Sequence, residues 1–88
     1  MTISLTTINF AKKRNVEVTV QDNGAEVWIW SCDNDCEPAI MLFASATGSF
    51  QYKGRVTASQ DVVSEIPAHY KDEKALRMMI AFIAGQID

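Results

Sequence analysis

Residues 16–32 read VEVTVQDNGAEVWIWSC and carry the strongest local folding signal in this 88-residue chain. Apolar and polar residues alternate on both sides of Asn23-Gly24, which is the pattern of two half-buried β-strands. Asparagine and glycine both tolerate a positive φ angle, so this pair predicts a tight two-residue turn. The segment therefore predicts an antiparallel β-hairpin.

A two-residue turn also fixes which residues of the hairpin lie opposite one another. The predicted pairs are Asp22–Ala25, Val20–Val27, Thr19–Trp28, Val18–Ile29 and Glu17–Trp30. One face of the hairpin then carries valine and isoleucine, and the other carries Glu17, Thr19 and both tryptophans. Because side chains alternate along a strand, a slip of one residue would exchange the two faces, so this register is a specific prediction.

The chain continues with two more predicted strands. Residues 39–44 (AIMLFA) are apolar on both faces, which is typical of a strand inside a sheet. Gly48 lies in the following turn, where a bulged hairpin loop uses glycine. Residues 50–56 (FQYKGRV) predict a fourth strand. Its apolar side is Phe50 and Tyr52, and its solvent side is Gln51, Lys53 and Arg55.

Helices are predicted near the C-terminus. A short helix ends before Pro67 and has Thr57 or Ser59 as its N-terminal cap. Residues 71–88 (KDEKALRMMIAFIAGQID) predict a longer helix, because their first turn is acidic and their interior consists of strong helix formers. The N-terminal residues 2–10 alternate in part like a strand, and we expect a strand there.

These elements predict a single α+β domain over residues 1–88. Its antiparallel meander has four to five strands, and the C-terminal helix, with the short helix before it, packs on one face. Such a helix layer leaves the other face of the sheet uncovered, either the valine face or the tryptophan face. The apolar stripe of the terminal helix is wider than a surface helix needs, since Met78 and Phe82 extend it.

Charge is distributed unevenly along the sequence. The net charge is −3, and residues 15–52 contain six carboxylates and no lysine or arginine. Like charges on one surface produce a field that selects partners of the opposite sign. Together with both tryptophans, they form the predicted partner-binding set: Glu17, Asp22, Glu26, Trp28, Trp30, Asp33, Asp35 and Glu37.

Residue types that carry catalysis or bind metals are sparse. Cys32 and Cys36 lie four positions apart, but a structural zinc site needs four ligands and His69 is the only histidine. Residues 33–37 (DNDCE) lack the glycine and the glutamate spacing of a calcium-binding EF-hand loop. There is no phosphate-binding glycine loop or nucleophile motif. We therefore expect no enzyme activity, no cofactor and no metal.

The sequence predicts a protein that binds another protein. Aromatic side chains supply affinity, and acidic side chains attract a basic partner, such as one that handles nucleic acids. Small acidic inhibitors or regulators of this kind occur among phage and mobile-element accessory proteins. Two alternatives remain open: a self-associating homodimer without a separate ligand, and a binder of a small molecule or metal.

The remaining expectations concern location and direct contacts. No run approaches the ~20 apolar residues of a membrane span, and the N-terminus has no secretory pattern, so we expect a cytoplasmic protein. The basic triplet at residues 12–14 is too short to indicate nucleic-acid binding in an acidic chain.

Overall fold

The computed structural model describes residues 3–33 and 36–86. Its five strands form one antiparallel sheet in the order β1-β2-β3-β4-β5. The elements in chain order are α1 (Leu5–Lys12), β1 (Val16–Gln21), η1 (Asp22–Gly24), β2 (Glu26–Ser31), β3 (Ile40–Ala44), β4 (Phe50–Arg55), α2 (Gln60–Val63), β5 (His69–Tyr70) and α3 (Glu73–Ala84). The fold is therefore α+β, as the sequence predicted.

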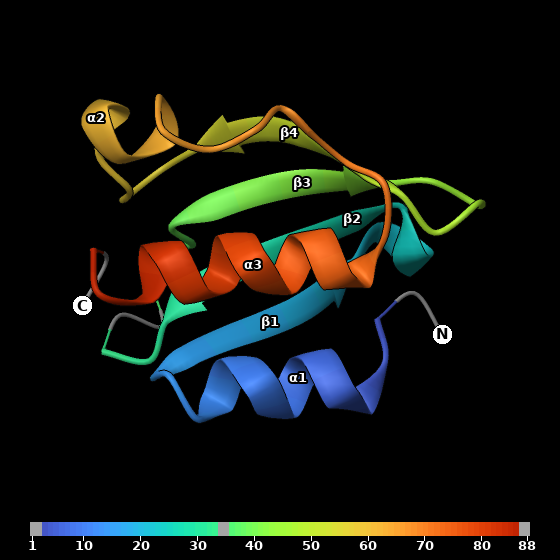
Figure 1. Ribbon diagram of the computed structural model, residues 1–88, viewed down its shortest axis with the longest axis horizontal. Coiled ribbons are helices and arrows are strands. Elements are labelled where there is room, and N and C mark those ends of the chain that lie inside the picture. The colour runs from blue at the N-terminus through green and yellow to red at the C-terminus, as the bar shows by residue number, and fades with distance from the viewer. Residues whose placement is uncertain (1–2, 34–35, 87–88) are drawn as a thin grey trace.

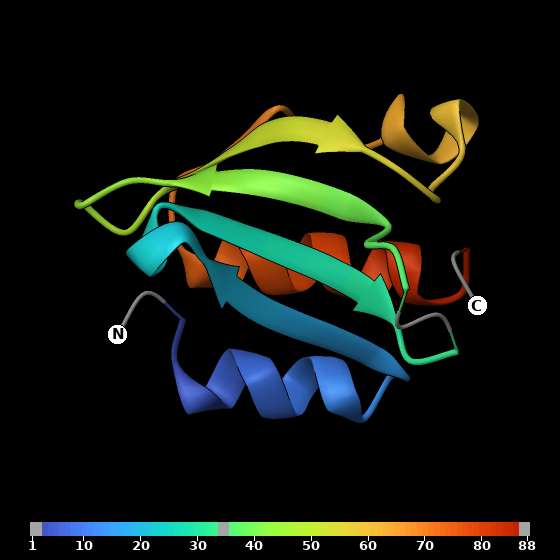
Figure 2. The same cartoon turned by 180° about the vertical axis from the view of Figure 1, so that it is seen from behind.

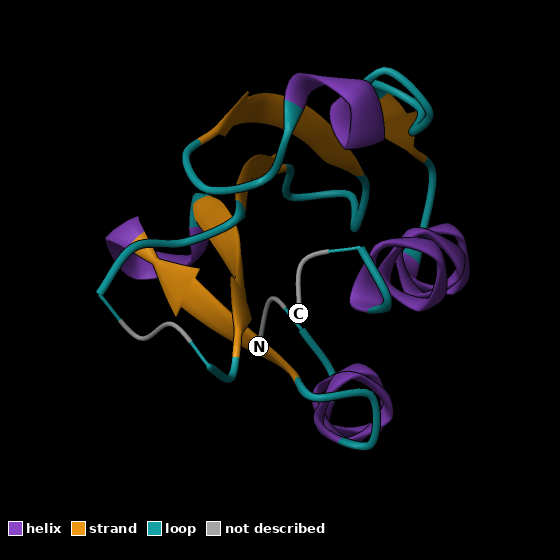
Figure 3. Cartoon of the chain, turned by 90° about the vertical axis from the view of Figure 1, so that its left-hand side faces the viewer, coloured by secondary structure: helices purple, strands orange, loops and turns teal. Residues whose placement is uncertain are grey.

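The helices are arranged unevenly about the sheet. Helix α3 crosses one face of the sheet, and α1 runs beside β1 (Figure 1). From behind, the strands lie in front of α3, and no helix covers them (Figure 2). The sheet curves toward α3, as the view along the molecule shows (Figure 3). One face of the sheet is thus covered and the other is open.

The register of the first hairpin is as predicted. Glu17 lies opposite Trp30, Thr19 lies opposite Trp28, and the intervening valines face the covered side. In the turn, Asn23 has a φ of 56° and Gly24 a φ of 95°, and the N–H of Ala25 donates to the carbonyl oxygen of Asp22 at 3.1 Å. Asp22 before them also has a positive φ, of 53°. Positive φ angles at Asn23 and Gly24 match the right-handed twist of the strands, which is why this dipeptide forms the turn.

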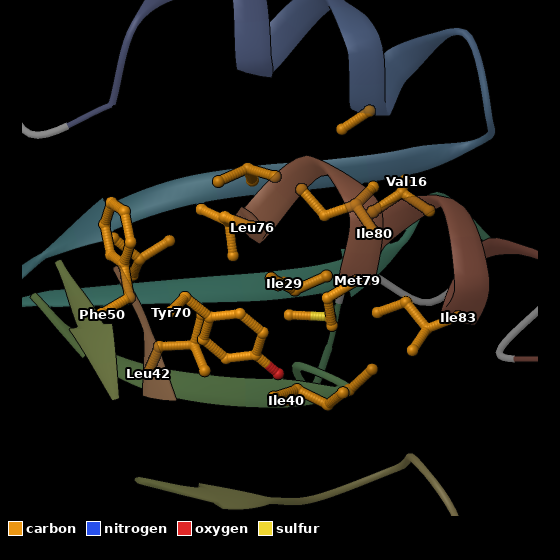
Figure 4. Close-up of a cluster of buried hydrophobic side chains, with 14 of the residues drawn as sticks. Val16, Ile29, Ile40, Leu42, Phe50, Tyr70, Leu76, Met79, Ile80 and Ile83 are labelled. Carbon is orange, nitrogen blue, oxygen red and sulfur yellow. The ribbon is translucent and has the colours of Figure 1, made fainter. Parts of the chain in front are cut away.

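The core lies between α3 and the covered face of the sheet. Helix α3 contributes Leu76, Met79, Ile80 and Ile83, and all of them are buried (Figure 4). The sheet contributes apolar residues from all five strands: Val16, Val18, Val27, Ile29, Ile40, Leu42, Phe50 and Tyr70. Helix α3 therefore packs on the valine face, which settles the choice that the sequence left open.

The predicted N-terminal strand is wrong, because residues Leu5–Lys12 form helix α1. Its buried positions are Thr7 and Ala11, four residues apart on one side of the helix, and the buried Ile3 precedes the helix at the same spacing. Because two of these buried positions are a threonine and an alanine, the sequence shows no clear apolar stripe there. The exposed Leu5, two residues after Ile3, instead gives the apolar-polar alternation that suggested a strand. The basic triplet at residues 12–14 ends the helix and leads into β1.

A hydrogen-bond network joins α1 to α3. The Oε1 atom of Glu73 accepts hydrogen bonds from Ser4 Oγ at 2.6 Å and from Thr7 Oγ1 at 2.5 Å. Thr7 Oγ1 also accepts from Arg77 Nη1 at 3.0 Å. Burial alone would raise the pKa of Glu73, but the hydrogen bonds from Ser4 and Thr7 lower it below its ordinary value. This network explains how a threonine is fully buried at the helix contact.

The solvent side of β4 differs from the prediction at one residue. Tyr52 pairs with Leu42 and Gly54 pairs with Met41, so a β-bulge leaves Lys53 as the extra residue. The bulge changes the alternation, so Arg55, which pairs with Ile40, does not lie on the same side of the sheet as Gln51. Its Nε donates to Gln60 Oε1 at 3.0 Å, and its Nη1 donates to the carbonyl oxygen of Ala58 at 3.2 Å.

The C-terminal helices follow the predicted signals. Ser59, and not Thr57, caps α2 by accepting from the N–H of Val62 at 3.2 Å. Asp72 caps α3 in the same way, accepting from the N–H of Ala75 at 2.9 Å. The two-residue strand β5 was not predicted, since it is too short to show a periodic pattern.

Candidate protein-binding surface

The uncovered side of the sheet is the candidate surface, and we call it the open face. Strand alternation and the observed registers place an aromatic and aliphatic centre on it, surrounded by polar side chains. The open face comprises Glu17, Thr19, Glu26, Trp28, Trp30, Met41, Phe43, Gln51 and Lys53. Among the described residues no helix lies over it (Figure 2).

The aromatic centre comes from two neighbouring strands. Trp28 and Trp30 alternate on β2, with ring centroids 6.0 Å apart and ring planes inclined at 43°. On β3, Met41 lies opposite Trp28, and Phe43 lies opposite Glu26. Phe43 is 48% exposed, while the two tryptophans and Met41 are half-buried. An uncovered aromatic row on a central pair of strands is more than scattered surface hydrophobicity, which is why this face is the candidate surface.

Hydrogen bonds hold both indole rings in place. Trp30 Nε1 donates to Thr19 Oγ1 at 2.9 Å, and Trp28 Nε1 donates to Glu26 Oε1 at 2.9 Å. The polar edge of each indole is therefore already paired within the chain. A partner that packs on these rings meets side chains with fixed conformations, which lowers the entropy lost on binding.

Glu26 does not act as an isolated acid. Lys53 Nζ lies 2.7 Å from its Oε1, and the same ammonium lies 5.6 Å from the centroid of the Phe43 ring. The hydrogen bonds from Lys53 and from Trp28 hold the pKa of Glu26 below its ordinary value. The carboxylates of residues 15–52 are thus not wholly without an opposing base, because Lys53 on β4 lies beside one of them.

The other predicted acids lie around the hairpin. Glu17 is exposed on the open face, opposite Trp30. Asp22 is exposed in the turn at one end, and Asp33 and Glu37 are exposed near the other end. Asp33 Oδ2 accepts from Asn15 Nδ2 at 3.2 Å. Asp35 lies outside the described residues. Four members of the predicted set therefore share the open face, and three border the hairpin ends.

Met41 and Phe43 are the apolar residues of this face that the sequence did not assign to it. The apolar run at residues 39–44 predicts a strand with two apolar faces, so it contains the signal for Met41 and Phe43. The register between β2 and β3 fixes which side each residue faces, and the long connection after Ser31 does not determine that register. Alternation had already placed Lys53 on the solvent side of β4, but its ion pair with Glu26 was not predicted.

A metal or nucleophile site from the cysteines and the histidine is not assembled. His69 pairs with Gln51. In the same row across the sheet, Gln51 pairs with Phe43 and Phe43 pairs with Glu26, so His69 is level with the beginning of β2. Cys32 follows the other end of β2, about 20 Å along the strand at ~3.3 Å per residue. Residues 3–33 and 36–86 contain no cluster of three metal-ligating side chains. In the same residues, no helix has both the length and the apolar character of a membrane span.

Comparison with known proteins adds no further assignment. No protein family model, curated protein or solved structure matches this chain. The function is therefore argued from the side chains of the open face.

Proposed function

We propose that this protein is a non-catalytic protein-binding module that acts through the open face. One observation carries the proposal: Trp28, Trp30, Met41 and Phe43 form a continuous apolar centre that no described helix covers. Tryptophan and methionine are enriched in interface cores, and tryptophan is frequent among the residues that dominate binding energy. The covered face already supplies the hydrophobic core, so this second apolar face is available for a partner.

The charges favour a basic partner. Glu17 lies beside the aromatic centre, and Asp22, Asp33 and Glu37 extend the acidic surface to both ends of the hairpin. Lys53 offsets only Glu26. Basic proteins that handle nucleic acids have complementary surfaces, and an inhibitor or regulator of such a protein fits this chemistry. We place this activity in the cytoplasm, as expected for a phage or mobile-element accessory protein.

The deciding experiment is affinity capture from native lysate, with recovered proteins identified by mass spectrometry. Wild type is compared with Phe43→Thr, which removes an exposed ring but leaves both indole hydrogen bonds intact. The matched control is Leu5→Gln, because Leu5 is a large exposed side chain (64%) on α1, away from the open face. We expect a basic partner to be recovered with wild type and with the control, and to be lost or strongly reduced with Phe43→Thr.

Two results would contradict this proposal. Equal recovery of the partner with wild type, Phe43→Thr and a folded Trp28→Ala/Trp30→Ala variant would remove the open face from the interaction. Recovery of only the protein itself, with association that depends on concentration in sedimentation velocity, would make the open face a homodimer interface. Either result is read only for variants whose circular dichroism shows the native fold.

The charge component has its own test. Glu17→Lys reverses a carboxylate next to Trp30 without touching the aromatic side chains. We expect the association rate with the captured partner to fall several-fold at low salt, and the difference from wild type to shrink at 1 M salt, where the Debye length is about 3 Å. An unchanged association rate at low salt would mean that the acids do not attract the partner.

A further inference from the structure

A pocket lies on the side of the sheet that α3 covers, so it is separate from the open face. It has a volume of about 330 Å³ and lies between α3 and the segment that leads from α2 into β5. Met78 (69% exposed) and Phe82 (42% exposed) form the α3 side, and Ile66 and Pro67 are on the opposite side. This volume is at the lower end of the range for small-molecule sites, which are concave and mainly apolar.

A buried polar group without a partner lies in the wall of the pocket. Tyr70 lines the pocket, is only 1% exposed, and its Oη atom makes no hydrogen bond to the described residues. Its oxygen points away from β5 toward Ile40 (Figure 4). Folded proteins pair nearly all buried polar atoms, so an unpaired hydroxyl indicates either a cost to stability or a missing ligand. Met79 lines the same pocket, and its unbranched side chain is able to move and open a path to the hydroxyl.

The charges around the pocket restrict the chemistry of its ligand. Glu65 and His69 are its ionisable side chains apart from Tyr70, and both are exposed. The other lining residues are apolar side chains and Tyr70, whose hydroxyl oxygen is enclosed in the wall. A charged ligand would lose its hydration there without gaining a buried counter-ion, which is costly. A neutral ligand with one hydrogen-bond acceptor loses little hydration free energy. Once Met79 has moved, its acceptor is able to pair with the Tyr70 hydroxyl.

We propose that the pocket between α3 and β5 binds a small, neutral, mainly apolar molecule with one carbonyl group, which accepts a hydrogen bond from the Tyr70 hydroxyl. The walls formed by Met78 and Phe82 supply apolar contact, and the hydroxyl supplies orientation. This site is independent of the open face and of the protein partner proposed for it.

The test uses two probes of nearly equal shape, acetophenone and ethylbenzene, titrated into the ¹⁵N-labelled protein and followed by amide chemical shifts. Acetophenone carries the carbonyl, and ethylbenzene lacks it. We expect shifts at residues 65–70 and 75–82, with acetophenone bound about fivefold more tightly, as one neutral hydrogen bond provides. Tyr70→Phe is expected to abolish this preference, while Tyr52→Phe, which removes a tyrosine hydroxyl elsewhere, is expected to retain it.

Ala75→Leu fills the pocket from α3, and it is expected to lower the affinity for both probes about tenfold or more. Equal affinities of the two probes for wild type, or a preference that survives in Tyr70→Phe, would overturn the role of the hydroxyl. Shifts confined to residues 26–30 and 41–43, or no saturable shifts at all, would overturn the site. Both probes are small molecules, so these outcomes do not depend on whether the open face binds a protein.

Discussion

Tyr70 carries a buried side-chain oxygen that has no hydrogen-bond partner among the described residues. Its ring fills the core between β5 and α3, but its hydroxyl is buried without a partner, and burial raises its pKa to about 12. The native state therefore holds this proton more strongly than the unfolded chain, whose tyrosines titrate near pH 10. Stability contributed by the neutral phenol is present below pH 10 and is lost as the pH rises toward 12.

Tyr70→Phe is therefore expected to increase the free energy of unfolding by about 1 kcal/mol at neutral pH, because it removes an unsatisfied buried group and keeps the ring. The gain should grow between pH 10 and pH 12, where only the wild type loses stability through this phenol. Urea denaturation at several pH values measures both effects. A loss of stability in Tyr70→Phe at neutral pH would show that the hydroxyl makes a favourable interaction in the native state.

Glu73 is a second residue whose surroundings define a pH dependence. Hydrogen bonds from Ser4 and Thr7 outweigh burial and lower its pKa. Because the folded-state pKa lies below the unfolded value near 4.5, its contribution is present above pH 4.5 and is lost as the pH falls through the folded-state value.

Glu73→Gln is expected to destabilise the protein by about 1–2 kcal/mol at pH 7, since the charged acceptor of three donors is lost. The difference from wild type should shrink as the pH falls below 4.5 through the folded-state pKa. Chemical denaturation at pH 7 and pH 3.5 tests this, with Glu65→Gln at an exposed carboxylate as the matched control. A constant difference at both pH values would mean that ionisation of Glu73 does not contribute.

At the scale of the elements, two glycines separate the effect of backbone conformation from the effect of space. Gly48 in the β3–β4 loop has a φ of 88°, whereas Gly85 at the end of α3 has a φ of −83°. An added Cβ would meet no heavy atom within 4 Å at either position. Any difference between the two alanine variants therefore comes from φ.

Gly48→Ala is expected to lower the free energy of unfolding by about 1 kcal/mol, because an alanine with a positive φ is strained. Gly85→Ala is expected to raise it by about 0.5 kcal/mol through the reduced entropy of the unfolded chain. Thermal and urea denaturation of both variants provide the comparison. Equal effects of the same sign would show that the loop after β3 accepts other conformations.

Elements also differ in how well their sequences specify them. The first hairpin and α3 are predictable because their own residues contain the turn dipeptide, the alternation or the helix cap. Helix α1 was misread because its buried stripe includes Thr7, whose polarity is compensated by Glu73 from the other end of the chain. Strand β5 has only two residues, and pairing with β4 defines it.

At the scale of the whole molecule, the sheet separates two surfaces. The open face lies on one side, and the pocket beside α3 lies on the other. The strands between them are fixed by paired backbone hydrogen bonds and a continuous core. Changes on one side should therefore leave binding on the other side unaffected.

This independence predicts a double-variant result. Phe43→Thr should reduce capture of the protein partner without altering the affinity for acetophenone, and Ala75→Leu should do the reverse. The two variants together should change stability by the sum of their separate effects, within about 0.5 kcal/mol, since the two positions lie on opposite sides of the sheet. Reduced capture of the partner by Ala75→Leu would show that the two surfaces are coupled through the sheet.

The candidate surface was also predictable in part, where local sequence patterns determine which side of a strand a residue faces. Alternation placed Glu17 and both tryptophans on one side of the hairpin, and the register confirms that placement. The side on which Met41 and Phe43 lie depends on the pairing of β3 with β2, and the ion pair of Lys53 with Glu26 depends on the pairing of β3 with β4. Their binding role remains a prediction that the capture experiment tests.

The sequence by itself determined the α+β class, the hairpin register and the place of α3 along the chain, because these depend on contacts between residues that are close along the chain. Only the tertiary structure decided which face α3 covers, that residues 5–12 are helical, and that Lys53 pairs with Glu26. Those outcomes depend on contacts between distant segments, where several packings satisfy the same local pattern and the burial of the whole core selects one.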